Sequence, residues 1–346
     1  MAVASALVLL GGLGACKGSE PDKGTDGGTP KIAFIVQNTS LSYAKEMGRG
    51  FEAGAKLSGG VEATVTGPQV SDGSKQVEIF RSLKGTTTGG ISVAAQEPEL
   101  FAPDLAEAGK GGLPLIAVDI PPAAGSGLKL YIGNDNRALG RDIAMEAIKR
   151  LPPNAAGKVI IGTNAPGLPA LEHRADGIRA AFAEKLPKVR VMGPFDTHFE
   201  VPANKAAWQG LVKANPGALA FMGTGDIDAF NLAAIRDETK GTWLAGGFGL
   251  DERTLTGVKA GKLFAAMSPE HYVKGALAAW LAAERAKRGT AMPEGWLYTP
   301  GLAVTAANVD EIMKRQSSES AKIEWFGPQI RKMTADLKPY LRPMPG

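Results

Sequence analysis

The chain has 346 residues, of which 44% are hydrophobic and 21% charged, a balance that is ordinary for a globular protein. Its net charge of +4 is small and its lysines and arginines are scattered, so the sequence lacks the pattern of a nucleic-acid-binding protein. A single cysteine excludes disulfide frameworks and cysteine-based metal sites, the three histidines show no zinc-binding spacing, and we expect neither a metal nor a cofactor.

An apolar run, Ala2 to Leu10, is followed by small residues that end at Cys16. This order is typical of a signal peptide, and the run is too short to span a bilayer as a helix. The segment from Leu13 to Cys16 resembles a bacterial lipobox, which implies a signal peptide over 1–16 and lipidation of Cys16. An incidental or buried thiol is the alternative. Residues 17–30 are almost free of apolar side chains and predict a flexible tether to a membrane-anchored body in the periplasm or at the cell surface.

From residue 31 onward, short apolar runs alternate with longer segments of helical periodicity. In the first half we expect strands at 31–36, 61–65, 90–94, 113–119 and 130–132, with helices from 42, at 75–83 and at 98–108. In the second half we expect strands at 158–162, 189–192, 218–222, 242–248 and 264–267. Helices are expected there at 138–149, 171–186, 203–214, 228–237 and 250–260, with a long one ending near 288.

This alternation predicts an α/β fold with two doubly wound parallel-sheet lobes, joined by a hinge and separated by a ligand cleft. We expect an N-terminal lobe at 31–134 that is completed by about 270–296. The C-terminal lobe is expected at 135–269 and is completed by about 299–315. Residues 316–346 form an extension, in which Trp325, Ile330 and Leu337 indicate an amphipathic helix that docks on a lobe.

Motifs of common enzymes are missing from the sequence. There is no glycine-rich dinucleotide fingerprint, no phosphate-binding loop with its lysine, and no nucleophile elbow. The glycine-rich segment 223–226 reads as a strand-to-helix turn. The sequence therefore favours a binding protein over an enzyme.

Several short segments, in order, resemble the periplasmic sugar-binding proteins of the ribose-binding type, which have the type I periplasmic binding protein fold. They are Leu113 to Asp119, Gly133 to Asn136 with Gly140, Arg174 to Gly177, Gly247-Phe248, Gly261 to Leu263 and Val304 to Asp310. The resemblance covers Lys31 to about Met313. It implies a monomeric solute-binding lipoprotein that passes a sugar-like ligand to the permease of an ABC importer.

The resemblance also implies a set of ligand-binding residues. Tyr43 and Phe199 would stack on a sugar ring, Asp119 would accept hydrogen bonds from hydroxyls, and Arg174 would donate to them. The alternatives are core packing for the aromatic residues, a helix cap or turn for Asp119 and a surface position for Arg174. The full set of expected binding residues is Gln37, Asn38, Tyr43, Asp119, Arg174, Phe199, Asp226, Phe248 and Glu270.

Four positions depart from the family pattern, since this chain has Ile120, Gly225, Gly249 and Pro269 where the family has polar side chains. Either nearby Asp226, Asp228, Asp251, Glu270 and His271 rebuild the polar set, or the ligand is larger, modified or less polar and fills added room at Gly225 and Gly249. Two other functions remain open. One is a ligand-sensing lipoprotein for a membrane receptor, and the other is a hydrolase that uses Asp119, Glu200 or Glu270 as general base.

Overall fold

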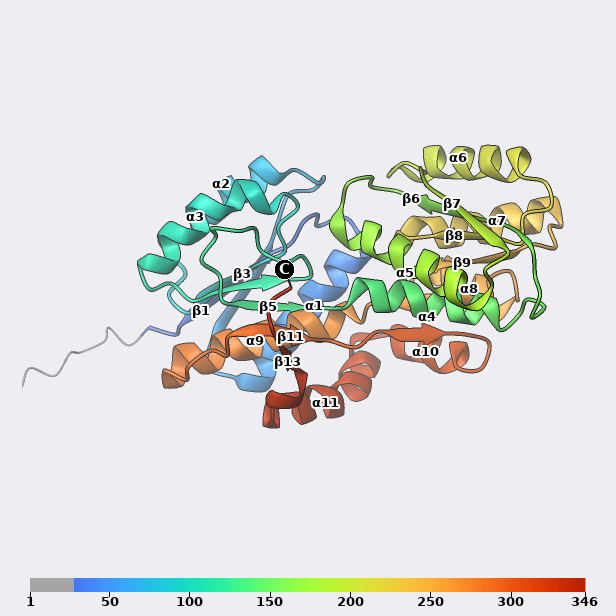
Figure 1. Cartoon of the computed structure of the whole chain (residues 1–346). Helices are drawn as coiled ribbons and strands as arrows, with labels where there is room; N and C mark the ends of the chain where they lie inside the picture. Colours follow the sequence, from blue (N-terminus) through green and yellow to red (C-terminus); the bar gives the residue numbers. More distant parts are fainter. Residues whose placement is uncertain (1–27, 346) are drawn as a thin grey trace, which may run out of the picture.

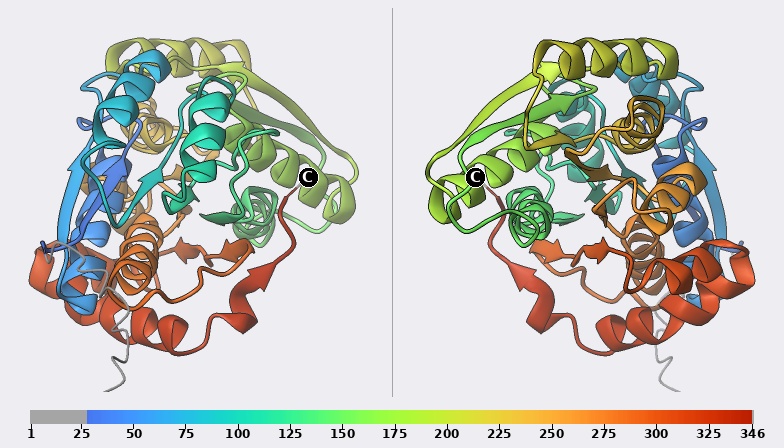
Figure 2. Two further views of the ribbon diagram at one scale, coloured as in Figure 1. Left: turned by 90° about the vertical axis from the view of Figure 1, so that its left-hand side faces the viewer. Right: turned by 90° about the vertical axis from the view of Figure 1, so that its right-hand side faces the viewer.

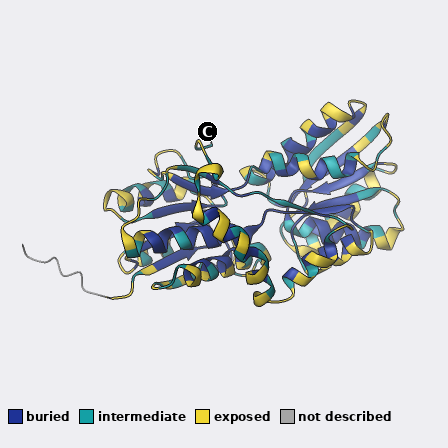
Figure 3. Cartoon of the chain, turned by 90° about the horizontal axis from the view of Figure 1, so that it is seen from below, coloured by how far each residue is buried: buried dark blue, intermediate teal, exposed yellow. Residues whose placement is uncertain are grey.

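The computed structural model describes residues 28–345, and Cys16 with the segment before it lies outside the described residues. Two α/β lobes lie next to each other and are joined by several crossing segments (Figures 1 and 3). No helix within residues 28–345 has the length and apolar character needed to cross a membrane. The two-lobe fold predicted from the sequence is confirmed.

The N-terminal lobe contains a seven-stranded sheet in the order β13-β11-β5-β4-β3-β1-β2. All neighbours pair in parallel except β13, which joins β11 in the antiparallel direction. The strands are β1 (Lys31–Ile35), β2 (Glu62–Thr66), β3 (Gly90–Val93), β4 (Leu115–Val118), β5 (Leu130–Gly133), β11 (Gly295–Tyr298) and β13 (Leu341–Arg342). The helices of this lobe are α1 (Ser42–Ser58), α2 (Gly73–Leu83), α3 (Pro98–Lys110), α9 (His271–Arg288) and α11 (Glu319–Ala335), followed by a short turn of 3₁₀ helix at Lys338–Tyr340.

The C-terminal lobe contains a six-stranded sheet in the order β12-β10-β9-β8-β6-β7, in which only β12 is antiparallel to its neighbour. Its strands are β6 (Gly157–Thr163), β7 (Val189–Asp196), β8 (Ala220–Gly223), β9 (Leu244–Phe248), β10 (Ala265–Ser268) and β12 (Leu302–Val304). Its helices are α4 (Asn136–Ile148), α5 (Pro169–Lys185), α6 (Val201–Ala214), α7 (Asp226–Thr239), α8 (Glu252–Lys259) and α10 (Val309–Gln316).

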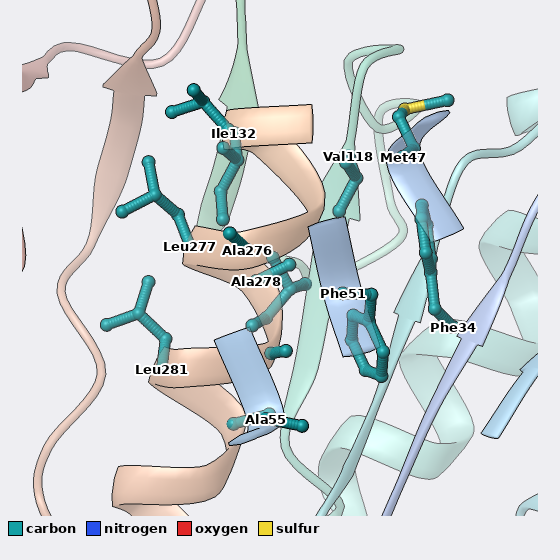
Figure 4. Close-up of a cluster of buried hydrophobic side chains, with 14 of the residues drawn as sticks. Phe34, Met47, Phe51, Ala55, Val118, Ile132, Ala276, Leu277, Ala278 and Leu281 are labelled. Carbon is teal, nitrogen blue, oxygen red and sulfur yellow. The ribbon is translucent and has the colours of Figure 1, made fainter. Parts of the chain in front are cut away.

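The core of the N-terminal lobe is built around the pair α1 and α9. Side chains from both helices meet residues of the sheet, among them Phe34, Phe51, Val118 and Leu277 (Figure 4). The two helices approach so closely that a Cβ atom on Gly275 would lie 1.9 Å from the backbone oxygen of Met47. Only glycine permits this approach, and the start of α9 is therefore held firmly against α1.

The chain passes between the lobes at four places among the described residues: from β5 to α4, from β10 to α9, from β11 to β12 and from α10 to α11. The last crossing belongs to the C-terminal extension, which runs along one side of the molecule in red (Figure 2). Helix α11 contributes Phe326, Ile330 and Met333 to the N-terminal core, and Phe326 stacks on Tyr272 at a centroid distance of 4.8 Å. The extension is thus an integral part of the N-terminal lobe.

Candidate functional site

A cavity of about 250 Å³ lies between the two lobes and is lined by residues of both. Its walls come from the segments that follow β1, β4, β6, β7, β8 and β9, which are the carboxyl ends of parallel strands. Doubly wound sheets place their ligands at this edge. We refer to this cavity as the cleft.

The N-terminal wall is organised around Asp119, which directly follows β4. Its backbone lies in the left-handed region with φ of 68°, an uncommon conformation for a residue other than glycine. The Tyr131 hydroxyl donates to the backbone oxygen of Asp119 at 3.0 Å, and Asp119 N donates to Ile132 O at 2.8 Å. These bonds hold the residue so that its carboxylate borders the cleft beside Gln37 and Tyr43.

Two basic groups at the start of α9 adjoin the Asp119 carboxylate. Lys274 Nζ lies 2.5 Å from Asp119 Oδ1 and 3.3 Å from Nδ1 of His271. Burial favours the neutral acid, but the Lys274 ammonium opposes this through its charge and its hydrogen bond, and the net effect is to lower the pKa of Asp119 below its ordinary value. The same burial, with Lys274 nearby, lowers the pKa of His271 well below 6.5, so its imidazole is neutral at pH 7.

The C-terminal wall presents Arg174 of α5, which is 5% exposed. Its Nε donates to Asn136 Oδ1 at 2.9 Å and its Nη1 donates to the backbone oxygen of Thr224 at 2.8 Å. The guanidinium lies over the ring of Phe248 at 4.2 Å from the centroid. These contacts fix the plane of the guanidinium and leave its other N–H groups for a ligand in the cleft.

Asp226, the first residue of α7, is the second carboxylate of the cleft. Burial raises its pKa to about 6, because the attraction of Arg174 only partly offsets the loss of water and Asp119 adds repulsion. The helix is capped instead by Asp228, whose Oδ2 accepts from the backbone N–H of Gly225 at 2.9 Å. The Asp226 side chain is consequently not needed as a cap.

Aromatic and aliphatic side chains complete the cleft. Tyr43 packs against the His271 ring on the N-terminal side, with centroids 5.4 Å apart. Phe199 and Phe230 line the C-terminal side, and the Arg253 guanidinium lies 3.5 Å from the centroid of Phe230. The cleft therefore offers aromatic surfaces on both lobes and charged polar groups between them.

A smaller cavity of about 60 Å³ adjoins the cleft and shares Tyr43, Asp226 and His271 with it. Glu270 borders this smaller space, but both of its carboxylate oxygens accept from Nη1 of Arg315, at 3.1 and 3.0 Å. Arg315 belongs to α10 and its side chain is fully buried. The pair joins the crossing between β10 and α9 to the last helix of the C-terminal lobe.

Six of the residues expected from the sequence border the cleft: Gln37, Tyr43, Asp119, Arg174, Phe199 and Asp226. Glu270 borders only the smaller cavity and is paired with Arg315. Asn38 and Phe248 border neither space. The Asn38 carboxamide oxygen accepts from the backbone N–H and hydroxyl of Ser40, and Phe248 is fully buried beneath Arg174.

The sequence predicted extra room for a ligand at Gly225 and Gly249, and this prediction is wrong. A Cβ atom on Gly225 would lie 2.0 Å from Oδ1 of Asn164, so the amide of Asn164 already fills that space. Gly249 has φ of 92°, and its Cβ would lie 3.2 Å from Asp226. Asn164 and Asp226 thus supply polar atoms where the glycines have none, and the cleft is not enlarged.

Among the polar residues considered as replacements, Asp226, Asp251 and His271 border the cleft. Asp228 does not, because its Oδ1 accepts hydrogen bonds from Thr197, Asn204 and Trp208 in the interior of the lobe. Sequence reasoning did not single out Asn164 or Lys274. Asn164 lies against Gly225 and Lys274 against Asp119, and both contacts join residues far apart in the chain. The only available signal was Lys274 itself, a lysine in the mostly apolar first half of α9.

Comparison with known proteins places these features in a family. Residues 32–291 match the family model described as "Periplasmic binding protein domain". Among curated proteins, none matches the sequence significantly. A solved structure of an ABC transporter solute-binding protein from Burkholderia graminis, in complex with D-arabinose, is 23% identical with a TM-score of 0.75. The match covers 82% of this chain and 98% of that chain.

Two further solved structures are similar to the same extent. One is an ABC transporter periplasmic solute-binding protein from Actinobacillus succinogenes with bound D-allose, 22% identical, with a TM-score of 0.74 and coverage of 82% of this chain and 99% of that chain. The other is an arabinose-binding protein from Geobacillus stearothermophilus, also 22% identical, with a TM-score of 0.72 and the same coverage. At these identities the likeness establishes a common fold.

Proposed function

The chain belongs to the periplasmic binding protein family, and we propose that it captures a sugar or sugar derivative in the cleft and delivers it to an ABC importer. The observation that carries the proposal is the combination of Asp119 and Arg174 with aromatic rings on both lobes. Carboxylate and guanidinium groups form strong hydrogen bonds with hydroxyls, and aromatic faces suit the apolar face of a sugar ring.

The size of the cleft supports a small ligand. Its volume of about 250 Å³ lies just below the range of roughly 300–1,000 Å³ that is common for small-molecule pockets. A single sugar ring is therefore favoured over an oligosaccharide. The structurally similar proteins with bound arabinose and allose support the same class of ligand.

The proposal is tested by thermal unfolding of the purified protein with a panel of pentoses, hexoses, polyols and sugar acids. A ligand at 100 times its dissociation constant stabilises the folded state by about 2.7 kcal/mol, which raises the melting temperature measurably. Arg174→Met is expected to abolish the shift. Arg141→Ala, which removes a partly exposed arginine of α4 that borders neither cavity, is expected to retain it. If no carbohydrate shifts the melting temperature, the ligand is not a sugar.

Delivery without chemical change is tested separately. The bound ligand is expected to be recovered unaltered after denaturation of the complex, as chromatography would establish, and the protein is expected to run as a monomer in gel filtration. Loss of uptake of the identified sugar on deletion of the protein would support the importer. Normal uptake would instead favour a sensor for a membrane receptor.

We further propose that Cys16 carries the lipid anchor. The proposal rests on the apolar run and the Leu-Gly-Ala-Cys segment of the sequence. Metabolic labelling with a clickable fatty acid is expected to mark the wild-type protein and not Cys16→Ser, and the variant should leave the membrane fraction. Equal labelling of both proteins would contradict the assignment.

A further inference from the structure

Lys274 is a buried lysine that no ligand in the cleft can reach directly. Its side chain is 1% exposed, it lies one turn into α9, and it does not border the cleft. The close packing of α9 on α1 at Gly275 fixes its backbone. A lysine buried in this way needs partners for its ammonium group, and here it has two.

The two partners are the groups that border the cleft beside it. Lys274 Nζ lies 2.5 Å from Asp119 Oδ1 and 3.3 Å from His271 Nδ1, while His271 Nδ1 and Asp119 Oδ1 are 3.6 Å apart. The three side chains thus form a triangle with the ammonium at its inner corner. Ile120, which follows Asp119, brings no charge to this part of the cleft.

The chemistry of the ammonium determines the state of both partners. A lysine ammonium has donors and no acceptor, so it donates to the Asp119 carboxylate and to Nδ1 of His271. Nδ1 must then hold a lone pair, and the proton of the neutral imidazole resides on Nε2. The cleft consequently meets an ionised acceptor, Asp119, beside a neutral N–H donor, His271.

The net charge of these three side chains is zero, because the ammonium cancels the carboxylate and the imidazole is neutral. A ligand ammonium would face the Nε2–H donor of His271 with the Lys274 charge behind it, and a ligand carboxylate would face the Asp119 carboxylate, so either would meet repulsion. A ligand hydroxyl is complementary to this part of the cleft, because it can donate a hydrogen bond to Asp119 while it accepts one from Nε2–H of His271.

We propose that Lys274 is a positioning residue that sets Asp119 as acceptor and His271 as Nε2–H donor, and thereby selects an uncharged polyhydroxyl ligand over amino sugars and sugar acids. This inference rests on the proposed function for the class of ligand. The arrangement of the three side chains stands independently of that function, and the two are tested by different measurements.

The first experiment needs no ligand. Nitrogen-15 NMR of histidine-labelled protein resolves three histidines, and His271→Gln assigns the signal of interest. His271 shares its surroundings with Tyr43, Asp119, Arg174, Asp226 and Lys274, and across the smaller cavity with Glu46, Asp251 and the Glu270–Arg315 pair. In the wild-type protein His271 is expected to keep the Nε2–H tautomer from pH 5 to 8.

Lys274→Met is expected to release His271, which should then take up a proton within that pH range beside the unpaired Asp119. The matched control is Lys287→Met, which removes a largely buried lysine at the other end of the same helix, paired with Glu284 at 3.0 Å and bordering neither cavity. The control should leave the His271 signals unchanged. An Nδ1–H tautomer in the wild type, or an unchanged His271 in Lys274→Met, would overturn the proposal.

A double variant keeps the test decisive if Lys274→Met folds poorly. Lys274→Met with Asp119→Asn removes both charges, and it is expected to recover much of the lost melting temperature, because no buried charge is then left unpaired. In this variant His271 should again resist protonation. Protonation of His271 between pH 5 and 8 in the double variant would contradict the proposed coupling of His271 to Lys274 and Asp119.

The second experiment measures selectivity with D-glucose, D-allose and D-arabinose against D-glucosamine and D-glucuronate. The wild type is expected to bind a neutral sugar at least tenfold more tightly than either charged sugar. Lys274→Met should weaken the neutral sugar at least tenfold and shift the preference toward glucosamine. Preferential wild-type binding of a charged sugar would overturn the ligand class, whereas binding of none of the five would count against the proposed function and leave the NMR result standing.

Discussion

Two carboxylates that border the cleft, Asp119 and Asp226, differ in ionisation although both are buried. Asp119 lies against Lys274, and the ion pair outweighs the cost of burial. Asp226 has only the partial compensation of Arg174 and is repelled by Asp119, which leaves its pKa at about 6. The difference in pKa between the two carboxyl groups therefore arises from the charges next to them and not from how deeply each is buried.

The raised pKa of Asp226 predicts a pH-dependent stability of the ligand-free protein. Because the folded-state pKa of about 6 exceeds the ordinary 3.8, the stabilisation from this carboxyl is complete below pH 3.8 and is lost as the pH rises to about 6. Asp226→Asn should thus be more stable than wild type by about 1–2 kcal/mol at pH 7, a figure below the full linkage value because the group faces the cavity. The gain should fall to a few tenths of a kcal/mol at pH 4.

Urea denaturation at pH 4 and pH 7 measures this difference. Asp310→Asn is the matched control, since Asp310 is exposed, and it should show no such change between the two pH values. An Asp226→Asn variant that is less stable than wild type at pH 7 would mean that the carboxylate is satisfied by its surroundings.

The sequence predicted individual residues best where a single strand end determines their position. Asp119 and Gln37 follow β4 and β1 directly, and both border the cleft as expected. Lys274 could not be predicted, because its contact with Asp119 joins residues 155 positions apart. The pairing of Glu270 with Arg315 could not be predicted for a similar reason, since the two residues are 45 positions apart.

Helix α9 is the element that connects the core to the cleft. Its first turn carries His271 and Lys274, and its next turns pack against α1 through glycine and alanine. Gly275→Ala would place a Cβ atom 1.9 Å from Met47 O, so the helices must separate. We expect a loss of about 2–4 kcal/mol in unfolding free energy, at the upper end of what overpacking costs.

Gly210→Ala provides the control for this prediction. Gly210 is exposed in α6 and its Cβ would meet no atom within 4 Å, so the change should stabilise the protein by about 0.5–1 kcal/mol. Equilibrium unfolding in urea compares the two variants. Equal stability of both would show that α1 and α9 can move apart freely.

At the level of elements, the predicted strands and helices agree with the structure through residue 288, with differences of a few residues at their ends. Four elements were not predicted from the sequence: the strands β11, β12 and β13 and the helix α10. Each is short, and the strands exist because they pair with distant partners, as β11 does with β5. The predicted tail helix exists as α11, although it starts at Glu319 and contains Pro328.

At the scale of the whole molecule, the segment from α10 to α11 connects the hydrophobic cores of the two lobes. Ile312 of α10 packs in the C-terminal lobe, and Phe326 of α11 packs in the N-terminal lobe on Tyr272. Only a short link around residues 317–318 separates the two helices. Truncation of Ile312 should therefore loosen the C-terminal lobe and truncation of Phe326 the N-terminal lobe, although the two residues lie in one continuous segment.

Phe326→Ala and Ile312→Ala form a reciprocal pair of tests. Each creates a cavity in a buried core and should cost about 3–5 and 2–5 kcal/mol, respectively. Hydrogen exchange measured by mass spectrometry should accelerate in α1 and α9 for Phe326→Ala and in α8 and β9 for Ile312→Ala. Acceleration confined to a different lobe in each variant would mean that each lobe unfolds as its own cooperative unit. Ligand capture would then be governed by how the four crossings join the lobes. Uniform acceleration in both variants would instead mean that the α10–α11 segment binds the lobes into one cooperative unit. Hinge motion would then have to occur without any local loss of packing.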